Sequence, residues 1–414
     1  MQLDLGPELE AFRDEIRTFI QDNTPEGMGY VDERQLYAGE FAPGARRDAY
    51  LEWERKLQDA KLICPQWPDE VGGRGLTGVE MAVLNEEFNR AGVPRVSRGM
   101  GESLVGPSII VHGTEEQKSH FLPRIIDGTD RYCQGFSEPD HGSDLAGVQT
   151  RGAVDGEEIV ITGQKVWTSG AQRANMIFIL CRTDPEVPKH QGLSYVLAPM
   201  TRDDGSSNGI ELQPLRQMTG ASGFCQEFIE GCRAPMFNVI GGLNNGWRVA
   251  MTTLGNERGG RATTQHLTYE REFWALVEEA KKRGRHEEPL VRQDLAWAYS
   301  HTQIMRFQGL RLLSQLAQKK EPGPEASISK LFWSEYHKRL GEIAINLTGA
   351  DGMIRPEESE GPFPSDYPLD RWQQSFLSSR AGTIFSGTSQ IQRKIIGERA
   401  LGLPKEPGLD DGRG

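Results

Sequence analysis

Residues 157–169 read EEIVITGQKVWTS, and this stretch decides the fold class because β-branched and aromatic residues are concentrated in it. Three similar runs follow at 174–181, 193–199 and 209–215, and Gly, Asp, Asn and Pro residues separate them. Short runs of this kind between turn-forming residues are typical of a compact antiparallel β domain. The sequence therefore predicts a middle β domain over residues 131–240.

The residues before this β domain have helical periodicity. Apolar residues with charged residues between them recur at helical spacing near the start of the chain, namely Leu9, Phe12, Ile16 and Phe19. Further on, Thr114 followed by Gln117 predicts a capping box at the start of another helix. We therefore expect an N-terminal helical domain over residues 1–130.

The residues after the β domain are helical again. Helices are predicted over 330–349 and 386–400, and a third, long helix carries Ile304, Phe307, Leu310 and Leu313 on one face. These segments predict a C-terminal helical bundle over residues 241–405, followed by a flexible polar tail over 406–414. The expected fold class is therefore α+β.

Composition excludes several classes of partner and site. The 414 residues include 47 Lys and Arg against 59 Asp and Glu, a net charge of −12 that disfavours nucleic acid and anionic membranes as partners. No apolar stretch approaches the length of a membrane-spanning helix, and the acidic start lacks a secretion signal. Five scattered cysteines predict neither a disulfide framework nor a metal site, so we expect a cytoplasmic protein.

Three segments are candidates for a binding site. The loop at 132–147, YCQGFSEPDHGSDLAG, could present backbone N–H groups and the hydroxyls of Ser137 and Ser143 to a polar ligand. Trp167 lies between valine and hydroxyl residues at a predicted strand end, where an indole could stack on a planar ring. The sequence at 385–402 predicts a helix N-terminus. Each segment by itself also fits an ordinary structural role as a surface turn, a buried tryptophan or a helix cap.

Taken in order and spacing, these segments resemble the acyl-CoA dehydrogenase family over essentially the whole chain. The family sequence TEPxAGSD is matched by SEPDHGSD at 137–144, and NGQKxWxT is matched by TGQKVWTS at 162–169. The turn DVxVPxxNxxG is similar to EGCRAPMFNVIGG at 230–242, and YEGTSxIQRxIIxR to FSGTSQIQRKIIGER at 385–399. The resemblance implies an N-terminal helical domain, a central β-barrel-like domain and a C-terminal four-helix bundle.

The resemblance also implies FAD as cofactor, an acyl-CoA thioester as substrate and electron transfer flavoprotein as the oxidant. By motif position, the implied FAD contacts are Gln134, Phe136, Ser137, Gly142 and Ser143, then Trp167, Thr168 and Ser169, and finally Gly387, Thr388 and Gln390. Trp167 would pack on the isoalloxazine ring and Ser169 would hydrogen-bond near flavin N5. Ser143 would also lie close to the CoA arm.

Part of each FAD site in this family comes from a neighbouring subunit. The family's RxxFG element is matched only by KKRGRHEE at 281–288, where Arg283 aligns best, and QxxGGxG only by NLTGADG at 346–352, which keeps Gly349. The resemblance implies a homotetramer or dimer, and a two-chain heterotetramer stays open. In such a heterotetramer this chain would be a non-catalytic or half-active subunit.

Desaturation of a thioester requires a carboxylate that removes the weakly acidic α-proton. In many family members this base is the glutamate of YEGT, but Ser386 stands at that position here. The long-chain and isovaleryl branches place a glutamate before an arginine at the start of the first C-terminal helix, which implies Glu257 as base and Arg258 on the substrate side. Ser386 would keep the backbone N–H that polarises the thioester oxygen.

Small residues follow the implied base. Gly259, Gly260 and Ala262 either leave room for a branched or bulky acyl group or pack closely against a neighbouring helix. A relative that binds nucleic acid is opposed by the net charge of −12.

Overall fold

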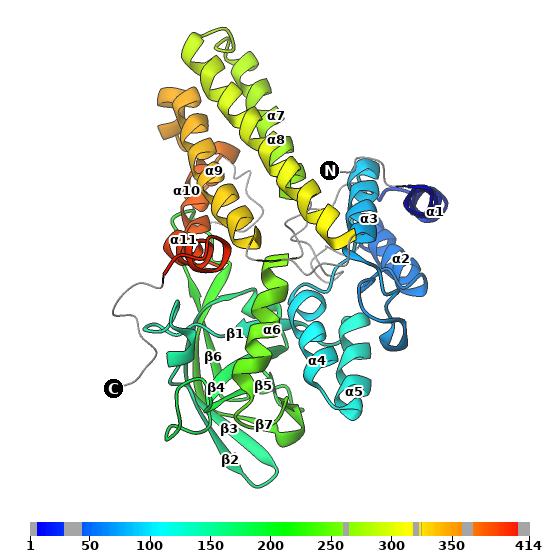
Figure 1. The fold of residues 1–414 in the computed structure, drawn as a ribbon, viewed down its shortest axis with the longest axis vertical. Helices are drawn as coiled ribbons and strands as arrows, with labels where there is room; N and C mark the ends of the chain where they lie inside the picture. The colour runs from blue at the N-terminus through cyan, green and yellow to red at the C-terminus, as the bar shows by residue number, and fades with distance from the viewer. Residues whose placement is uncertain are drawn as a thin grey trace.

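The computed structural model of this chain describes residues 6–28, 44–259, 265–317, 323, 325–357 and 367–404. Figure 1 shows the strands in the lower part of the molecule, with N-terminal helices beside them and most of the C-terminal helices above. The first C-terminal helix, at residues 246–259, lies alongside the strands. Separate hydrophobic cores form inside the β domain and inside the bundle, and a third joins the N-terminal helices to one side of the sheet.

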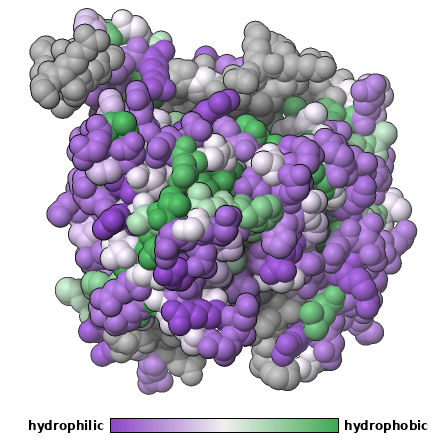
Figure 2. Space-filling model, turned by 90° about the horizontal axis from the view of Figure 1, so that it is seen from below, coloured by the Kyte–Doolittle hydropathy of each residue, from purple (hydrophilic) through white to green (hydrophobic). Residues whose placement is uncertain are grey.

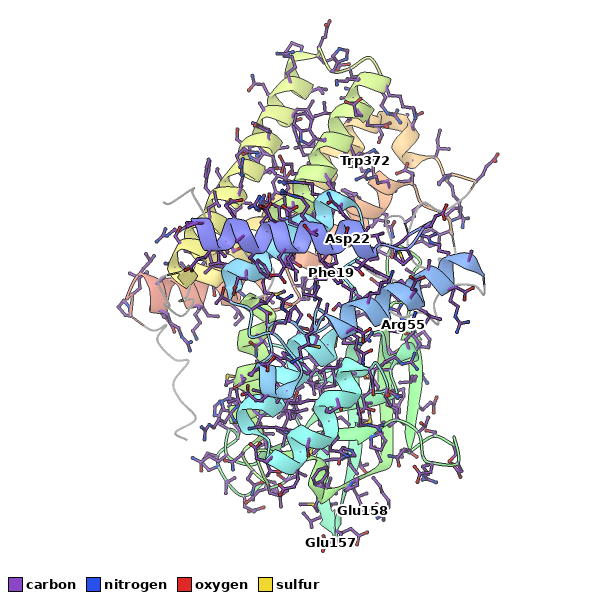
Figure 3. All side chains as sticks on the ribbon, turned by 90° about the vertical axis from the view of Figure 1, so that its right-hand side faces the viewer. Phe19, Asp22, Arg55, Glu157, Glu158 and Trp372 are labelled. Carbon is purple, nitrogen blue, oxygen red and sulfur yellow. The ribbon has the colours of Figure 1, made fainter. Side chains whose placement is uncertain are left out.

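The N-terminal part is helical, as predicted. Its helices are α1 Pro7–Asn23, α2 Ala45–Asp59, α3 Gly78–Ala91, α4 Gly106–His112 and α5 Glu115–Ile126. The first helix buries Phe12, Ile16 and Ile20. Phe19 of α1 packs against Trp53 of α2 with ring centroids 5.8 Å apart, and Figure 3 shows it where the two helices meet. The capping box of Thr114 and Gln117 is confirmed at the start of α5.

The described part of the β domain is one eight-stranded sheet. Its strands are β1 Tyr132–Gly135, β2 Arg151–Asp155, β3 Glu158–Ser169, β4 Met176–Arg182, β5 Leu193–Pro199, β6 Ile210–Leu215, β7 Phe224–Pro235 and β8 Val239–Ile240. The order is β6-β7-β3-β2-β4-β5-β8, with β1 paired to β4. All four predicted runs form strands. Most strand pairs are antiparallel, as predicted, but β1 and β2 both pair with β4 in parallel.

Strand β7 was missed by the sequence analysis, although it pairs with β3 along its whole length. Part of it, residues 230–235, was assigned to the family turn instead. The pattern failed because Glu227 occupies a buried position and Gly231 a bend in the strand, so the apolar alternation is interrupted. Pairing with β3, which is distant in sequence, stabilises the strand in spite of this.

The described C-terminal part contains α6 Gly246–Gly259, α7 Gln265–Lys282, α8 Pro289–Ala317, α9 Glu325–Thr348, α10 Arg371–Gly382 and α11 Ser389–Ile395. Helices α7 to α10 share one core that includes Trp372. Figure 3 places Trp372 in the bundle and Glu158 at the opposite end, at the tip of the β2–β3 hairpin. Because β3 begins at that tip and runs toward the bundle, its last residues lie at the junction between the β domain and the bundle.

The long helix α8 is confirmed, but Ile304 and Phe307 on its predicted apolar face are 41% and 51% exposed. The face seen from below in Figure 2 is mostly hydrophilic, with a hydrophobic patch near its centre. Among the described helices, none has the length and apolar character needed to cross a membrane. All five cysteines are buried free thiols.

Candidate active site

A buried ion pair fixes the loop that follows β1. The Lys165 ammonium lies 2.9 Å from Glu138 Oε1, with side-chain exposures of 0% and 7%. Lys165 also donates to the carbonyl oxygens of Phe136 and Leu180. Glu138 accepts hydrogen bonds from the backbone N–H groups of residues 149–150. The loop after Gly135 is therefore tied from inside the sheet to a strand that is distant in sequence.

Glu138 and Lys165 each stabilise the charged form of the other against the effect of burial. Burial acts to raise the pKa of Glu138, but Lys165 and the backbone N–H donors outweigh it and hold that pKa below its ordinary value. Burial also lowers the pKa of Lys165, and Glu138 opposes this effect. With all these hydrogen bonds, the buried ion pair has little net effect on the stability of the fold, but removal of one partner is strongly destabilising.

Trp167 lies at a β-bulge near the end of β3. The pairing with β7 shifts register between Val166 and Thr168, and Trp167 itself has a left-handed backbone with φ of 65°. Its indole is 60% exposed and meets Phe224 edge-on, with centroids 6.2 Å apart. A non-glycine residue in this conformation is strained, and such strain is concentrated at ligand sites. The bulge holds a flat aromatic ring out of the sheet.

The structure brings the first two predicted segments together. The Val166 N–H donates to the Ser137 carbonyl over 2.9 Å, and the Thr168 hydroxyl lies 3.1 Å from the Gln134 carbonyl. The predicted loop residues and the bulge are therefore direct neighbours. The half-buried Ser169 follows Trp167 by two residues and ends the same strand.

Two of the predicted cofactor residues have side chains that belong to the core. Phe136 is 4% exposed and packs edge-on against Phe178 and Tyr195. Thr168 is 1% exposed and hydrogen-bonds inside the sheet. Any contact of these two residues with a cofactor would have to come from their main-chain atoms.

Gly142 and Ser143 lie in an exposed part of the same loop. A tight turn precedes them, in which Glu138 and His141 exchange backbone hydrogen bonds of 3.1 Å in both directions. Apart from its two chain neighbours, no described residue has an atom within 4 Å of the position where Gly142 would carry a Cβ. This stretch is open to a ligand from outside.

The third predicted segment forms a strained turn before α11. Ser386 and Gly387 are both left-handed, with φ of 51° and 85°, and Thr388 caps the helix by accepting the Ile391 N–H. The fully buried Gln392 holds the turn, because its Nε2 donates to the Ser386 carbonyl over 3.0 Å. Figures 1 and 3 both place α11 between the bundle and the β domain.

The structure assigns different positions to Gln390 and Gln392. Gln390, the predicted cofactor residue, is exposed on α11, whereas the buried Gln392 makes the contacts that shape the turn. Gln392 was missed by the sequence analysis, although it stands at a fixed position of the quoted IQR motif. Lys165 and Glu138 were missed as well. A lysine inside a β-rich run signals a buried ion pair, because an unpaired charge there would be very costly.

Arg283 and Gly349 lie together, but far from Trp167. Arg283 pairs with Glu279 at 2.6 Å and with Asp351 at 2.7 Å. It also donates to the carbonyl of Thr348, the last residue of α9, which the left-handed Gly349 follows. In Figure 1 the turn between α7 and α8 is at the upper end of the bundle, remote from the β domain of the same chain. Within one chain, Arg283 and Gly349 therefore do not lie at the same site as the Trp167 bulge.

Glu257 and Arg258 fall in the last turn of α6, and their side chains lie outside the described residues. The prediction that Glu257 stands at a helix start is wrong, because α6 begins at Gly246 and ends at Gly259. Gly260 and Ala262 are also outside the described residues. In Figure 1 the C-terminal end of α6 reaches the junction where α11 lies.

Family profiles match nearly the whole chain. The matches are acyl-CoA dehydrogenase, N-terminal domain, at residues 6–129; acyl-CoA dehydrogenase, middle domain, at 133–230; and acyl-CoA dehydrogenase, C-terminal domain, at 244–401.

Individual relatives agree with these matches. Acyl-CoA dehydrogenase IpdE1 of Mycobacterium tuberculosis is 39% identical over 409 residues, which cover 96% of this chain and 99% of the relative. A solved structure described as the Tcur3481-Tcur3483 steroid ACAD has a TM-score of 0.77 at 30% identity, covering 98% of this chain and 100% of its own. The ChsE4-ChsE5 complex from Mycobacterium tuberculosis has a TM-score of 0.73 at 25% identity, covering 98% and 100%. The chain thus belongs to the acyl-CoA dehydrogenase family, whose members are flavin-dependent oxidoreductases that act on acyl-CoA.

Proposed function

We propose that this protein binds FAD at the Trp167 bulge and dehydrogenates an acyl-CoA thioester between Cα and Cβ, with Glu257 as the base. The single observation that carries the proposal is the bulge itself. An indole that is 60% exposed is held in a strained backbone conformation, two residues before Ser169. The preceding residue, Val166, donates its N–H to the carbonyl of Ser137 in the loop. A flat apolar face next to hydroxyl and backbone donors fits the planar, hydrogen-bonding ring system of a flavin.

Different residues of this chain have different roles in the proposed reaction. FAD, when bound, supplies the acceptor for the β-hydride. Glu257 holds the α-proton after its removal, and Ser386 cannot replace it because a neutral hydroxyl is too weak a base. The Ser386–Gly387 turn, held by Gln392, presents main-chain groups at the junction where negative charge develops on the thioester oxygen.

The acyl group is proposed to be branched, polycyclic or otherwise bulky. Gly259, Gly260 and Ala262 follow the proposed base and carry little side-chain volume. The 30% identical solved structure described as a steroid ACAD supports the same substrate class. Electron transfer flavoprotein is the proposed acceptor of the electrons.

The proposed FAD site is completed by a neighbouring subunit. Arg283 and Gly349 lie at the far end of the bundle from Trp167, so they can contribute only to the site of another chain. Large apolar side chains on the described faces of α7 and α8 remain exposed in one chain, among them Trp274 at 51% and Phe307 at 51%. Burial of such residues between subunits would stabilise a homodimer or homotetramer, or a heterotetramer with a second chain.

The experiment uses the full-length protein expressed alone. Visible absorbance measures bound flavin, and chromatography of the released cofactor identifies it. Straight-chain, branched and steroid acyl-CoA thioesters are then assayed with ferrocenium as acceptor. We expect a yellow protein that is most active on a bulky thioester. A folded, colourless protein without activity would overturn the proposal for this chain alone and would favour a half-active subunit that needs a partner.

A further inference from the structure

Glu227 is a fully buried carboxyl group behind the Trp167 bulge. It lies on β7 directly opposite Lys165 of β3, with 0% exposure. Its Oε2 is 2.7 Å from Thr168 Oγ1, and its buried Oε1 has no hydrogen-bond partner within the described part of the chain. Neither the ion pair of Glu138 nor the proposed reaction explains why an acid stands here.

The hydrogen bonds of Thr168 indicate that the carboxyl group of Glu227 is protonated. Thr168 Oγ1 lies within hydrogen-bonding distance of two oxygens, Glu227 Oε2 at 2.7 Å and the Gln134 carbonyl at 3.1 Å. A hydroxyl has one hydrogen to donate, and a carbonyl oxygen can only accept. A carboxylate at Glu227 would force the one hydroxyl hydrogen to be shared between the two acceptors. Each contact is a full hydrogen bond when Glu227 is protonated and donates to Thr168, which then donates to Gln134.

The groups around Glu227 favour the protonated acid. The cation that faces it, Lys165, is already engaged by Glu138 and two carbonyl oxygens. The thiols of Cys133 on β1 and Cys225 on β7 are neutral near pH 7, because burial raises the pKa of both. Burial likewise raises the pKa of Glu227 to about 7, against the opposing effects of Thr168 and Lys165.

We propose that Glu227 is a positioning residue whose protonated carboxyl group, acting through Thr168, fixes the bulge that presents Trp167 and Ser169 to the flavin. The hydrogen-bond chain from Glu227 through Thr168 to Gln134 ties β7, β3 and β1 together immediately behind the indole. Loss of the proton breaks the bond to Gln134, because the Thr168 hydroxyl turns to the carboxylate, and it leaves a negative charge behind the ring. The role in flavin presentation rests on the function proposed above.

The test compares the full-length wild type with Glu227→Gln and with the control Glu230→Gln, an exposed carboxylate on the same strand. Infrared difference spectroscopy of the cofactor-free protein follows the band of a protonated carboxyl group as the pH is raised through 7. We expect the wild type and Glu230→Gln to lose this band with a midpoint near 7 and Glu227→Gln to lack it. A third variant, Thr168→Val, should move the midpoint upward, because it removes the donor to which the deprotonated carboxylate turns. A hydrogen bond to a charged group is stronger than one to a neutral acid, so the carboxylate form loses more.

The visible spectrum of bound flavin is the second readout. In the wild type it should shift with the same midpoint, whereas Glu227→Gln should keep the acid-form spectrum throughout, because the amide donates to Thr168 at every pH. An unchanged carboxyl band in Glu227→Gln, or a flavin shift identical to the wild type, would overturn the inference. A wild type that binds no flavin would defeat the proposed function instead, and the infrared titration would still decide whether Glu227 carries the proton.

Discussion

The hydroxyl groups of Ser108 and Thr253 meet at 2.7 Å inside the contact between α4 and α6. Thr253 is fully buried, and its hydroxyl also lies 3.4 Å from the Tyr195 hydroxyl of β5. This contact fixes α6 against both the N-terminal helices and the sheet. Glu257 follows Thr253 by four residues, about one turn later along α6. The contacts of Thr253 therefore fix the backbone of α6 one turn before the proposed base.

Glu257→Gln should abolish turnover while the protein stays folded and keeps its flavin. A positioned general base typically contributes about 10²- to 10⁴-fold to the rate, and an amide cannot accept the α-proton. Stopped-flow reduction of the flavin by the best thioester measures the loss, and circular dichroism checks the fold. Glu278→Gln, which alters an exposed carboxylate of α7, is the matched control. A Glu257→Gln variant as fast as the wild type would end the assignment.

Ser386→Ala should have only a small effect on the same rate. The side chain is not the proposed base, and the peptide group at this position remains after the substitution. A reduction of a few-fold or less in the stopped-flow experiment is expected. Loss of activity comparable to that of Glu257→Gln would mean that the reacting groups have been wrongly assigned.

Lys165→Met should destabilise the β domain strongly. It leaves the buried Glu138 carboxylate without its cation, a change that costs about 3–5 kcal/mol in comparable sites. Chemical denaturation measures the free energy of unfolding. The control is Lys189→Met, which removes an ion pair with Asp144 of the same 2.9 Å length but with both side chains about half exposed. That change should cost under about 1 kcal/mol. Equal effects of the two substitutions would contradict this account.

Gly387→Ala should weaken flavin retention. Gly387 has a φ of 85°, and an added Cβ would lie 2.5 Å from the Gln392 amide that holds the turn. Gly402→Ala is the control. Gly402 also has a left-handed backbone, with a φ of 66°, but no described residue lies near its Cβ position, so this variant introduces backbone strain without a steric clash. Left-handed strain costs about 1–2 kcal/mol in either variant. Only Gly387→Ala should release flavin on gel filtration, and equal retention in both would argue against a cofactor contact at this turn.

Stability should fall as the pH rises from about 4.5 through 7, because of Glu227. Its pKa in the folded protein is raised to about 7 from an ordinary value of 4.5, so the folded protein holds the proton more tightly than the unfolded chain. The stabilisation is complete below the unfolded pKa and is lost as the pH passes the folded pKa. At about 1.4 kcal/mol per pKa unit, the contribution to the free energy of unfolding is at most about 3.5 kcal/mol. Denaturation curves of the wild type should show this dependence, and those of Glu227→Gln should lack it.

Sequence alone determined the three-part α+β layout and the order of the site segments. Helical periodicity, strand runs and caps such as Thr114–Gln117 depend on residues close in the chain, so local pattern was sufficient to find them. It failed for β7, because a buried Glu227 and a bend at Gly231 interrupt the alternation that marks a strand. It also misplaced Glu257 relative to its helix, since the start of α6 depends on the turn before Gly246.

Only the tertiary structure decided which side chains could act together. The Lys165–Glu138 pair, the Gln392 contact with the Ser386 carbonyl and the proton on Glu227 all arise between segments brought close by folding or by the local turn. Charge and hydrogen-bond energies depend on distance and burial, and one-dimensional sequence contains neither. The sequence specified the residues available for the chemistry. The packing of β1, β3 and β7 determined which of them face the proposed flavin site and which support it from behind.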